Sequence, residues 1–260
     1  MKKILILYFS GAGATLNSAK YMQTCINDIT GCSAYIHSME DDLEENINNY
    51  DALIIGTPCY HCAPCLTLIS FFKKLPKLIN TKPAMVFNSY SLWSCNTNRI
   101  TAKIIREKNI ITIYDTAYRS PASDGTLITP FIKRFFEFEK NIYEKINADC
   151  NKFVSIINEE YTGDIPHFKI SSIFNAPNKL IGHLMTFNIY IHQDKCIKCR
   201  KCISRCPHNA LYSNNNNYPA FIKTKCENCY RCIHNCPKNA LSLSQKKIPY
   251  KTLKEIYKTI

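Results

Sequence analysis

The sequence predicts an α/β protein with a parallel sheet, followed by a small cysteine-rich α+β domain. Apolar segments of strand length alternate with helical segments over the first 160 or so residues, which is typical of a parallel sheet covered on both faces. A loop of small residues follows the first apolar segment directly, and a cysteine pattern occurs twice near the C-terminus. At 260 residues, the chain has room for about two domains.

The first predicted strand is the apolar run Lys2–Phe9, which is too short and wrongly flanked for a signal peptide. A helix should follow it, with a stripe formed by Leu16, Ala19, Met22, Ile26 and Ile29. Four further strands are predicted at Ala34–His37, Asp51–Thr57, Lys82–Asn88 and Ile110–Ala117. The remaining helices are predicted at Cys65–Leu75, Asn98–Lys108 and Thr129–Asn158, and an acidic polar stretch, Glu40–Asn49, separates two of the strands.

The loop Ser10–Thr15 has the composition of a phosphate cradle. Gly11 and Gly13 would let backbone N–H groups approach a phosphate, and the following helix adds its positive end. Ser10 and Thr15 add hydroxyl donors. The loop lacks the P-loop lysine, so ATP is disfavoured. A tight strand-to-helix turn without a ligand is the alternative interpretation.

Over residues 1–160, the pattern of strand, loop and helix resembles the flavodoxin family. In that family, an S/T-x-T-G-x-T loop binds the phosphate of FMN. The resemblance implies five strands in the order 2-1-3-4-5 and FMN at their carboxyl ends. On that basis the FMN-binding residues are Ser10, Gly11, Ala12, Gly13, Ala14, Thr15, Thr57, Pro58, Tyr60, Ser89, Tyr90 and Trp93.

Two features of the candidate FMN site depart from the flavodoxin pattern, and one of its aromatic residues has a second interpretation. Ala12 and Ala14 replace the usual Thr and Asn, and the loop after the fourth strand is not glycine-rich. Tyr60, Tyr90 and Trp93 are the candidates for stacking on the flavin ring. Alternatively, Trp93 packs on the domain surface or against the C-terminal domain.

Two cysteine runs repeat at an offset of 30 residues. The first run, Cys196–Cys206, and the second run, Cys226–Cys236, both have the spacing C-x2-C-x2-C-x3-C-P. Two residues between ligands let one loop turn three thiolates toward one [4Fe–4S] cube, while the fourth, held away by proline, reaches the other cube. The first cysteine set is therefore Cys196, Cys199, Cys202 and Cys236, and the second cysteine set is Cys226, Cys229, Cys232 and Cys206.

These runs resemble the dicluster ferredoxin family over residues 190–245. Zinc is disfavoured, because two C-x-x-C pairs complete a zinc site and leave the third cysteine of each run unused. A disulfide framework is disfavoured because the chain has an odd number of cysteines, 15, and no expected signal peptide.

Seven cysteines lie outside the two runs. Cys59, Cys62 and Cys65 share the spacing C-x2-C-x2-C, and Cys95 lies on the next predicted loop. Three interpretations stay open for these four: a third metal site, a redox-active Cys62–Cys65 dithiol at a helix N-terminus, or small apolar side chains that fill space. Three isolated cysteines are expected to be structural, namely Cys25, Cys32 and Cys150.

The positive charge is concentrated in the C-terminal domain. Residues 190–260 contain 14 Lys and Arg against 3 Asp and Glu, a formal charge of +11, whereas the rest of the chain carries +2. This charge would suit an acidic redox partner protein or nonspecific contact with nucleic acid, although a solvated lysine-rich face explains it equally well. No specific nucleic acid and no membrane span are expected, and the unpaired cysteines suggest a cytoplasmic location.

The expected domains are a flavodoxin-like domain at residues 1–160, an ordered connection at 161–189, the ferredoxin domain at 190–245 and a basic tail at 246–260. His183 and His192 could ligate iron, but eight cysteines already complete two clusters. At most, the tail would form a short helix at Tyr250–Tyr257.

The combination resembles the flavodoxin–ferredoxin fusion proteins of anaerobic bacteria. The resemblance implies electron transfer between FMN, two [4Fe–4S] clusters and an external partner, as a flavin-dependent oxidoreductase or its electron-transfer component. No catalytic acid, base or nucleophile is evident. The alternative is a ferredoxin whose flavodoxin-like domain has lost FMN and serves as a docking module for a partner.

Overall fold

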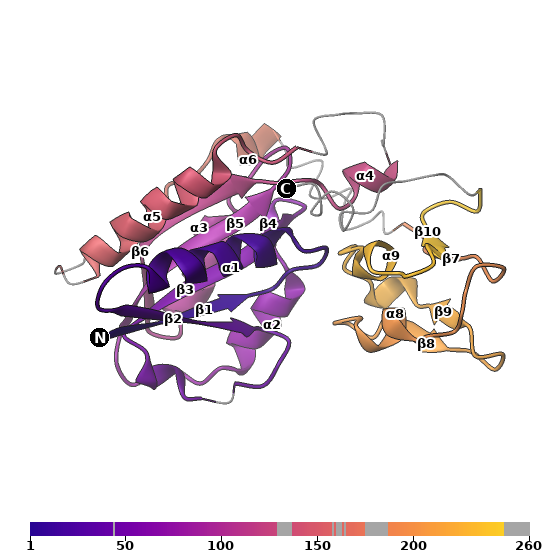
Figure 1. The fold of residues 1–260 in the computed structure, drawn as a ribbon, viewed down its shortest axis with the longest axis horizontal. Helices are drawn as coiled ribbons and strands as arrows, with labels where there is room; N and C mark the ends of the chain where they lie inside the picture. The colour runs from indigo at the N-terminus through magenta and orange to yellow at the C-terminus, as the bar shows by residue number, and fades with distance from the viewer. Residues whose placement is uncertain are drawn as a thin grey trace. The chain divides into compact units, whose positions relative to one another are not determined.

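The structure is a computed structural model that divides the chain into two compact units (Figure 1). It describes residues 1–43, 45–128, 137–157, 159, 163, 165–174 and 187–246. The sheet unit comprises residues 1–10, 14–119 and 138–177. The cysteine unit comprises residues 11–13, 120–137 and 178–260.

Five parallel strands form the sheet unit. They are β1 (Lys2–Tyr8), β2 (Cys32–Ser38), β3 (Ala52–Tyr60), β5 (Lys82–Tyr90) and β6 (Ile110–Arg119), and they lie in the order β2-β1-β3-β5-β6. Counted without the two-residue strand β4 (Ala63–Pro64), which pairs antiparallel with the end of β3, this is the predicted order 2-1-3-4-5. The predicted fold class is therefore confirmed.

Helices cover both faces of this sheet, because side chains along each strand point alternately to opposite sides. One face packs on α1 (Ala14–Asn27) and α5 (Ile142–Ile156). The other face packs on α2 (Leu66–Lys74) and α3 (Thr97–Arg106). Two further short elements in the unit are η1 (Ile47–Asn49) and α6 (Ser171–Phe174).

The prediction of one long helix at Thr129–Asn158 is wrong for residues 137–141. Only α5 is helical there, and residues 137–141 are irregular. The backbone N–H of Glu139 donates to the carbonyl of Arg119, so this segment extends the contacts of β6 and does not begin a helix. Asn141, which precedes α5, has a φ of 56°. Residues 129–136 lie outside the described part.

The cysteine unit is built from short elements. Two antiparallel pairs join β7 (Tyr190–Ile191) to β10 (Leu241–Ser242) and β8 (Leu211–Ser213) to β9 (Pro219–Phe221). The short helices are α8 (Lys201–Ser204), α9 (Arg231–His234), η3 (Lys223–Lys225) and α4 (Gly125–Ile128). α4 belongs to this unit although it follows β6 in the chain, and its Leu127 joins the apolar core of the unit.

Within the described ranges, no helix is both long and apolar enough to cross a bilayer. The predicted helix at Tyr250–Tyr257 and His183 lie outside these ranges. His192 is described, and its Nε2 lies 2.7 Å from the hydroxyl of Ser242, which is a packing contact between β7 and β10.

Candidate metal centres

The 30-residue repeat reappears in the backbone of the two cysteine runs. Residues with left-handed φ occur in pairs at this offset: Lys198 and Asn228, Arg200 and Tyr230, and Asn209 and Asn239. α8 and α9 occupy equivalent positions in the two runs. The left-handed residues between the cysteines reverse the chain locally, so each run curls into a loop with its thiols directed inward.

One pocket of the cysteine unit contains all four thiols of the first cysteine set. Its lining includes Cys196, Cys199, Cys202 and Cys236. The first three belong to the first run, and Cys236 comes from the end of the second run. Cys236 accepts a hydrogen bond from the backbone N–H of Ala240, at 3.2 Å from N to Sγ.

A second pocket contains all four thiols of the second cysteine set. Its lining includes Cys206, Cys226, Cys229 and Cys232. Here Cys206 comes from the end of the first run, and its Sγ accepts from the backbone N–H of Ala210 at 3.2 Å, the equivalent contact in the repeat. The structure thus brings the eight run cysteines together in two groups of four, with the last cysteine of each run in the group of the other run.

Electrostatic interactions between the thiols follow the same grouping. Burial raises the pKa of Cys202 to about 11, and Cys236 is the neighbouring thiol that contributes most to this rise. The pKa of Cys232 is also raised, first by burial and then by Cys229, Cys226 and Cys206 in turn. Four thiolates in one pocket repel one another, so a cation must compensate their charge before all of them can ionise.

The donor set fits a [4Fe–4S] cluster. Thiolates are its usual ligands, and iron supplies the positive charge that lets a buried thiol lose its proton. Among the described residues, no group of three or more His, Cys, Asp or Glu is arranged to hold a single metal ion. A cluster makes a different demand, because each of the four thiolates binds a different iron atom at a corner of the cube.

The two sets differ in their exposure to solvent. Cys199 of the first set is exposed, whereas its repeat equivalent, Cys229, is only 9% exposed. Burial raises the pKa of Cys229 to about 12, although the backbone N–H and the charge of Arg231 lower it. Cys226 accepts from the backbone N–H of Asn228 at 3.4 Å. The second set therefore lies in the less polar surroundings.

His234 fixes the second run to the α4 segment. Its Nε2 donates to the carbonyl oxygen of Ser123 at 2.7 Å, and the side chain is 2% exposed. Burial lowers the pKa of His234 to about 4, so the ring is neutral near pH 7. His208 forms a different contact, with its Nε2 2.7 Å from a carboxylate oxygen of Glu227. Both histidines act in packing and support the loops that carry the cysteines.

The predicted FMN residues lie at the carboxyl ends of the strands: in the last residues of β3 and β5, between β1 and the first turn of α1, and, for Trp93, just after β5. Gly13 has a φ of 113°, which favours glycine and lets the loop turn into α1. The hydroxyls of Thr15 and Ser89 are buried and bonded to each other at 2.6 Å. Thr57 is fully buried, and its hydroxyl donates to the carbonyl of Pro58.

The other predicted residues of the FMN site are less uniform. Pro58, Ser10 and Gly11 are buried, whereas Ala12, Ala14, Tyr60 and Tyr90 are half-buried. Trp93 is 49% exposed. The phosphate end of the site therefore has buried polar groups, and its aromatic side chains are more open to solvent.

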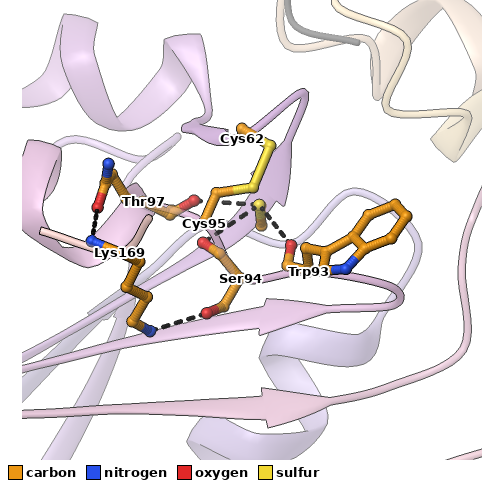
Figure 2. Close-up of a disulfide and its surroundings, with 8 residues drawn as sticks. Cys62, Trp93, Ser94, Cys95, Thr97 and Lys169 are labelled. Atoms are coloured by element: carbon orange, nitrogen blue, oxygen red, sulfur yellow. Dashed lines mark hydrogen bonds between the residues drawn. A yellow bond between two sulfur atoms is a disulfide. The ribbon is translucent and has the colours of Figure 1, made fainter. Parts of the chain in front are cut away.

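A disulfide joins the two loops that were expected to flank the flavin ring. It links Cys62 to Cys95, with 5.1 Å between the Cα atoms, as Figure 2 shows. Cys65 is not the partner of Cys62. Instead, it is buried and caps α2, since its Sγ accepts from the N–H of Leu68. The two linked cysteines follow β3 and β5, which are neighbours in the sheet. The predicted strand order could have indicated this pairing, but the two cysteines lie 33 residues apart in the sequence.

The disulfide restricts where a flavin ring could lie. A ring with a group stacked on each face needs roughly 7 Å between those groups, because carbon atoms in contact lie about 3.5 Å apart. The Cα atoms of Cys62 and Cys95 are only 5.1 Å apart, so a flavin ring cannot stack between these two residues. The predicted residues of the site therefore fit the phosphate end of FMN, but not a ring held between Cys62 and Cys95.

Comparison with known proteins identifies the cysteine unit. Residues 189–243 match the model of a protein family described as a 4Fe-4S dicluster domain. The chain is also 32% identical over 75 residues to pyruvate synthase subunit PorD of Pyrococcus horikoshii, which corresponds to 28% of this chain and 68% of that protein. The chain belongs to the 4Fe-4S dicluster ferredoxin family. The predicted C-terminal dicluster ferredoxin domain is thereby confirmed.

Solved structures similar to the chain include several flavodoxins. A flavodoxin from the domain Archaea is 15% identical and matches with a TM-score of 0.44 over 60% of this chain and 99% of its own. A short-chain flavodoxin associated with a bacterial microcompartment gives 0.47 at 10% identity, over 61% and 100%. A WrbA-like flavodoxin from Agrobacterium tumefaciens gives 0.46 at 14% identity, over 62% and 100%. The fold assignment rests on the strand order and not on these scores.

Proposed function

We propose that the chain is an electron-transfer protein that binds two [4Fe–4S] clusters through the first and second cysteine sets. The observation that carries this proposal is the exchange of the fourth cysteine, since Cys236 lines the pocket of the first run and Cys206 that of the second run. If each run bound a metal on its own, the last cysteine of each run would lie in the pocket of its own run. An interlocked pair of cluster sites requires the exchange.

The residues of the chain have three roles in this function. Eight thiolates bind iron, backbone N–H groups such as those of Ala210 and Ala240 donate to cysteine sulfur, and apolar side chains limit water around the sites. Hydrogen bonds to sulfur and burial are the protein's means of setting a cluster's reduction potential. A bound [4Fe–4S] cluster supplies transfer of one electron at a time.

The external partner is proposed to be an acidic redox protein. Lys195 directly precedes the first run, Lys201 and Arg205 lie within it, and all three are exposed; Lys201 also lines the pocket of the first cysteine set. An array of positive charge around an exposed donor or acceptor speeds encounter with a negatively charged protein. The relative PorD is by name a subunit of pyruvate synthase, and we propose that this chain exchanges electrons with a larger oxidoreductase.

We further propose that the loop Ser10–Thr15, which leads into α1, binds the phosphate of FMN. Gly13 adopts the required left-handed backbone, α1 has 14 residues and begins at Ala14, and Thr15 lies buried in the first turn. These features support an anion at the helix N-terminus. When bound, FMN would supply exchange of two electrons.

A second candidate for the sheet unit is a docking module that has lost FMN. The disulfide between Cys62 and Cys95 favours it, because it closes the space between the loops where a ring would stack. In that case electrons would enter and leave through the ferredoxin domain alone.

One set of assays on protein purified without oxygen tests the function and separates the two candidates. We expect about eight iron and eight sulfide per chain, as two cubes require. About one flavin per chain would support the FMN proposal, and its absence would support the docking module. Iron without sulfide would contradict the cluster proposal.

If flavin is present, variants of the loop test its position. Ser10→Ala and Thr15→Ala should release flavin, whereas Thr24→Ala, an exposed threonine on the same helix, should leave it bound. Flavin retention in the loop variants would place it elsewhere.

A further inference from the structure

Three cysteines of the sheet unit meet where the loops after β3 and β5 approach each other. Cys62 and Cys95 are linked (Figure 2), and Cys59, near the end of β3, has its Sγ 3.7 Å from the carbonyl oxygen of Ser94, the residue before Cys95. The two strands are neighbours, with Pro58 opposite Ser89. We propose that Cys62 and Cys95 form a reversible dithiol–disulfide centre that exchanges two electrons with an external dithiol.

The different exposure of the two cysteines gives the exchange a direction. Cys62 is half-buried, whereas Cys95 is 2% exposed. An incoming thiolate therefore reaches the sulfur of Cys62, and Cys95 leaves as the thiolate.

The surroundings of Cys95 favour a leaving thiolate. Cys95 lies two residues before α3, a helix of 10 residues, and the N-terminal end of a helix stabilises negative charge. The ammonium of Lys169 donates to the hydroxyl of the adjacent Ser94 at 2.8 Å (Figure 2). The backbone N–H of Lys169 donates to Asn96, which fixes this lysine beside the loop. A thiol with a lower pKa leaves more rapidly.

Cys59 supplies a third thiol next to the disulfide. Its Sγ accepts from the hydroxyl of Thr97 at 3.0 Å and from the backbone N–H of Cys62. As a donor, it lies 3.4 Å from the carbonyl oxygen of Trp93. Burial raises the pKa of Cys59, so near pH 7 this thiol is protonated and does not attack the disulfide.

Two observations argue against a purely structural crosslink. Both linked residues have left-handed backbone, with φ of 64° at Cys62 and 45° at Cys95, and non-glycine residues in this region cluster at functional sites. The second observation rests on the proposed function: eight cluster ligands must stay reduced, and a disulfide that forms in reducing surroundings is usually transient and catalytic or redox-sensing.

The exchange proceeds in two steps. The first thiolate of the external dithiol bonds to the sulfur of Cys62, and the bond between Cys62 and Cys95 breaks. The second thiol of the dithiol then attacks its own mixed disulfide and releases Cys62. The dithiol loses two electrons and two protons, and Cys62 and Cys95 gain them as two thiols.

The test is a redox titration of the full chain, purified without oxygen, with dithiothreitol as the dithiol probe. Native protein is equilibrated at several ratios of reduced to oxidised dithiothreitol and alkylated, and the Cys62 and Cys95 peptides are quantified by mass spectrometry. We expect the linked fraction to follow the ratio reversibly as a two-electron couple. A link that persists until the protein is unfolded, or that forms at no ratio, would overturn the proposal.

Variants separate an exchanging centre from a crosslink that is merely exposed. Lys169→Met should slow reduction of the disulfide by about three- to tenfold, because Cys95 becomes a poorer leaving group. Cys32→Ser, in the same unit but at the start of β2, should leave the rate unchanged. Equal rates for Lys169→Met and the unaltered protein would overturn the proposed role of this lysine and, with it, the activated leaving group on which the centre depends.

Iron is measured on the same samples to keep the two proposals apart. A titrating disulfide in protein that binds about eight iron supports both. A titrating disulfide in protein that binds no iron supports the dithiol centre and contradicts the cluster function.

Discussion

The two cysteine runs share one pattern and occupy different environments. In the first run Cys199, Arg200 and Ser204 are exposed. At the equivalent positions of the second run Cys229, Tyr230 and His234 are buried. Tyr230 and His234 are the substitutions that bring the second run into contact with the α4 segment through Leu127 and Ser123.

This difference shows how a repeated motif can give two unequal sites. The cysteines and the left-handed positions define the loop, so they are retained in both runs. The residues between the cysteines determine whether another part of the chain packs over the loop. We therefore propose that a partner contacts the exposed first run and that the second run holds the more protected site.

The largest expected effect comes from removing one exchanged cysteine. Cys206→Ser or Cys236→Ser should each reduce bound iron from about eight to about four per chain, because each cysteine would complete one of the two proposed clusters. Iron and acid-labile sulfide, measured on protein prepared without oxygen, check this. Cys25→Ser, outside both sets, should retain the full amount. Unchanged iron in Cys206→Ser would remove this residue from the ligands.

Charge reversal should distinguish the two runs as partner surfaces. The double change Lys195→Glu and Lys201→Glu should slow electron transfer to a strongly acidic redox protein by about tenfold at low salt, because steering is lost. Lys225→Glu, at the repeat equivalent of Lys195, should change the rate less than about twofold. Stopped-flow kinetics at several ionic strengths measure both. A larger effect from Lys225→Glu would reverse the assignment.

The buried contact of the second run should contribute to stability. His234→Ala leaves the Ser123 carbonyl without its donor and opens space in the core, at a cost of about 2 kcal/mol in the free energy of unfolding. Ser204→Ala, the repeat equivalent, is exposed and should change it by less than about 0.5 kcal/mol. Denaturant unfolding of the cluster-loaded proteins compares the two, and equal effects would contradict the inequality of the runs.

The smallest expected effect is a difference in reduction potential. Burial disfavours the extra negative charge of a reduced cluster, so the site containing Cys229 should have the lower potential. Cys236→Ser retains this site and Cys206→Ser retains the other, so a redox titration followed by electron paramagnetic resonance can compare them one at a time. A lower potential for the site containing Cys199 would show that burial does not dominate.

Local sequence patterns predicted much of the fold and the grouping of the run cysteines. The alternation of apolar segments predicted the five strands of the sheet, because burial on both faces leaves near-continuous apolar runs. The 30-residue repeat predicted the composition of the two sets. Contacts between distant segments could not be predicted in this way. The role of Ser123 depends on a loop after β6 that belongs to the cysteine unit, and Cys62 pairs with Cys95 through the order of β3 and β5.

The exchange of fourth cysteines between the runs is tested most directly by iron content in two double variants. Cys206→Ser with Cys226→Ser removes two members of one proposed set, so about four iron should remain. Cys206→Ser with Cys196→Ser removes one member of each set, so almost none should remain. If each run instead bound its own cluster, the results would be inverted: the pair Cys206 and Cys196 would retain about four iron, and the pair Cys206 and Cys226 would retain none.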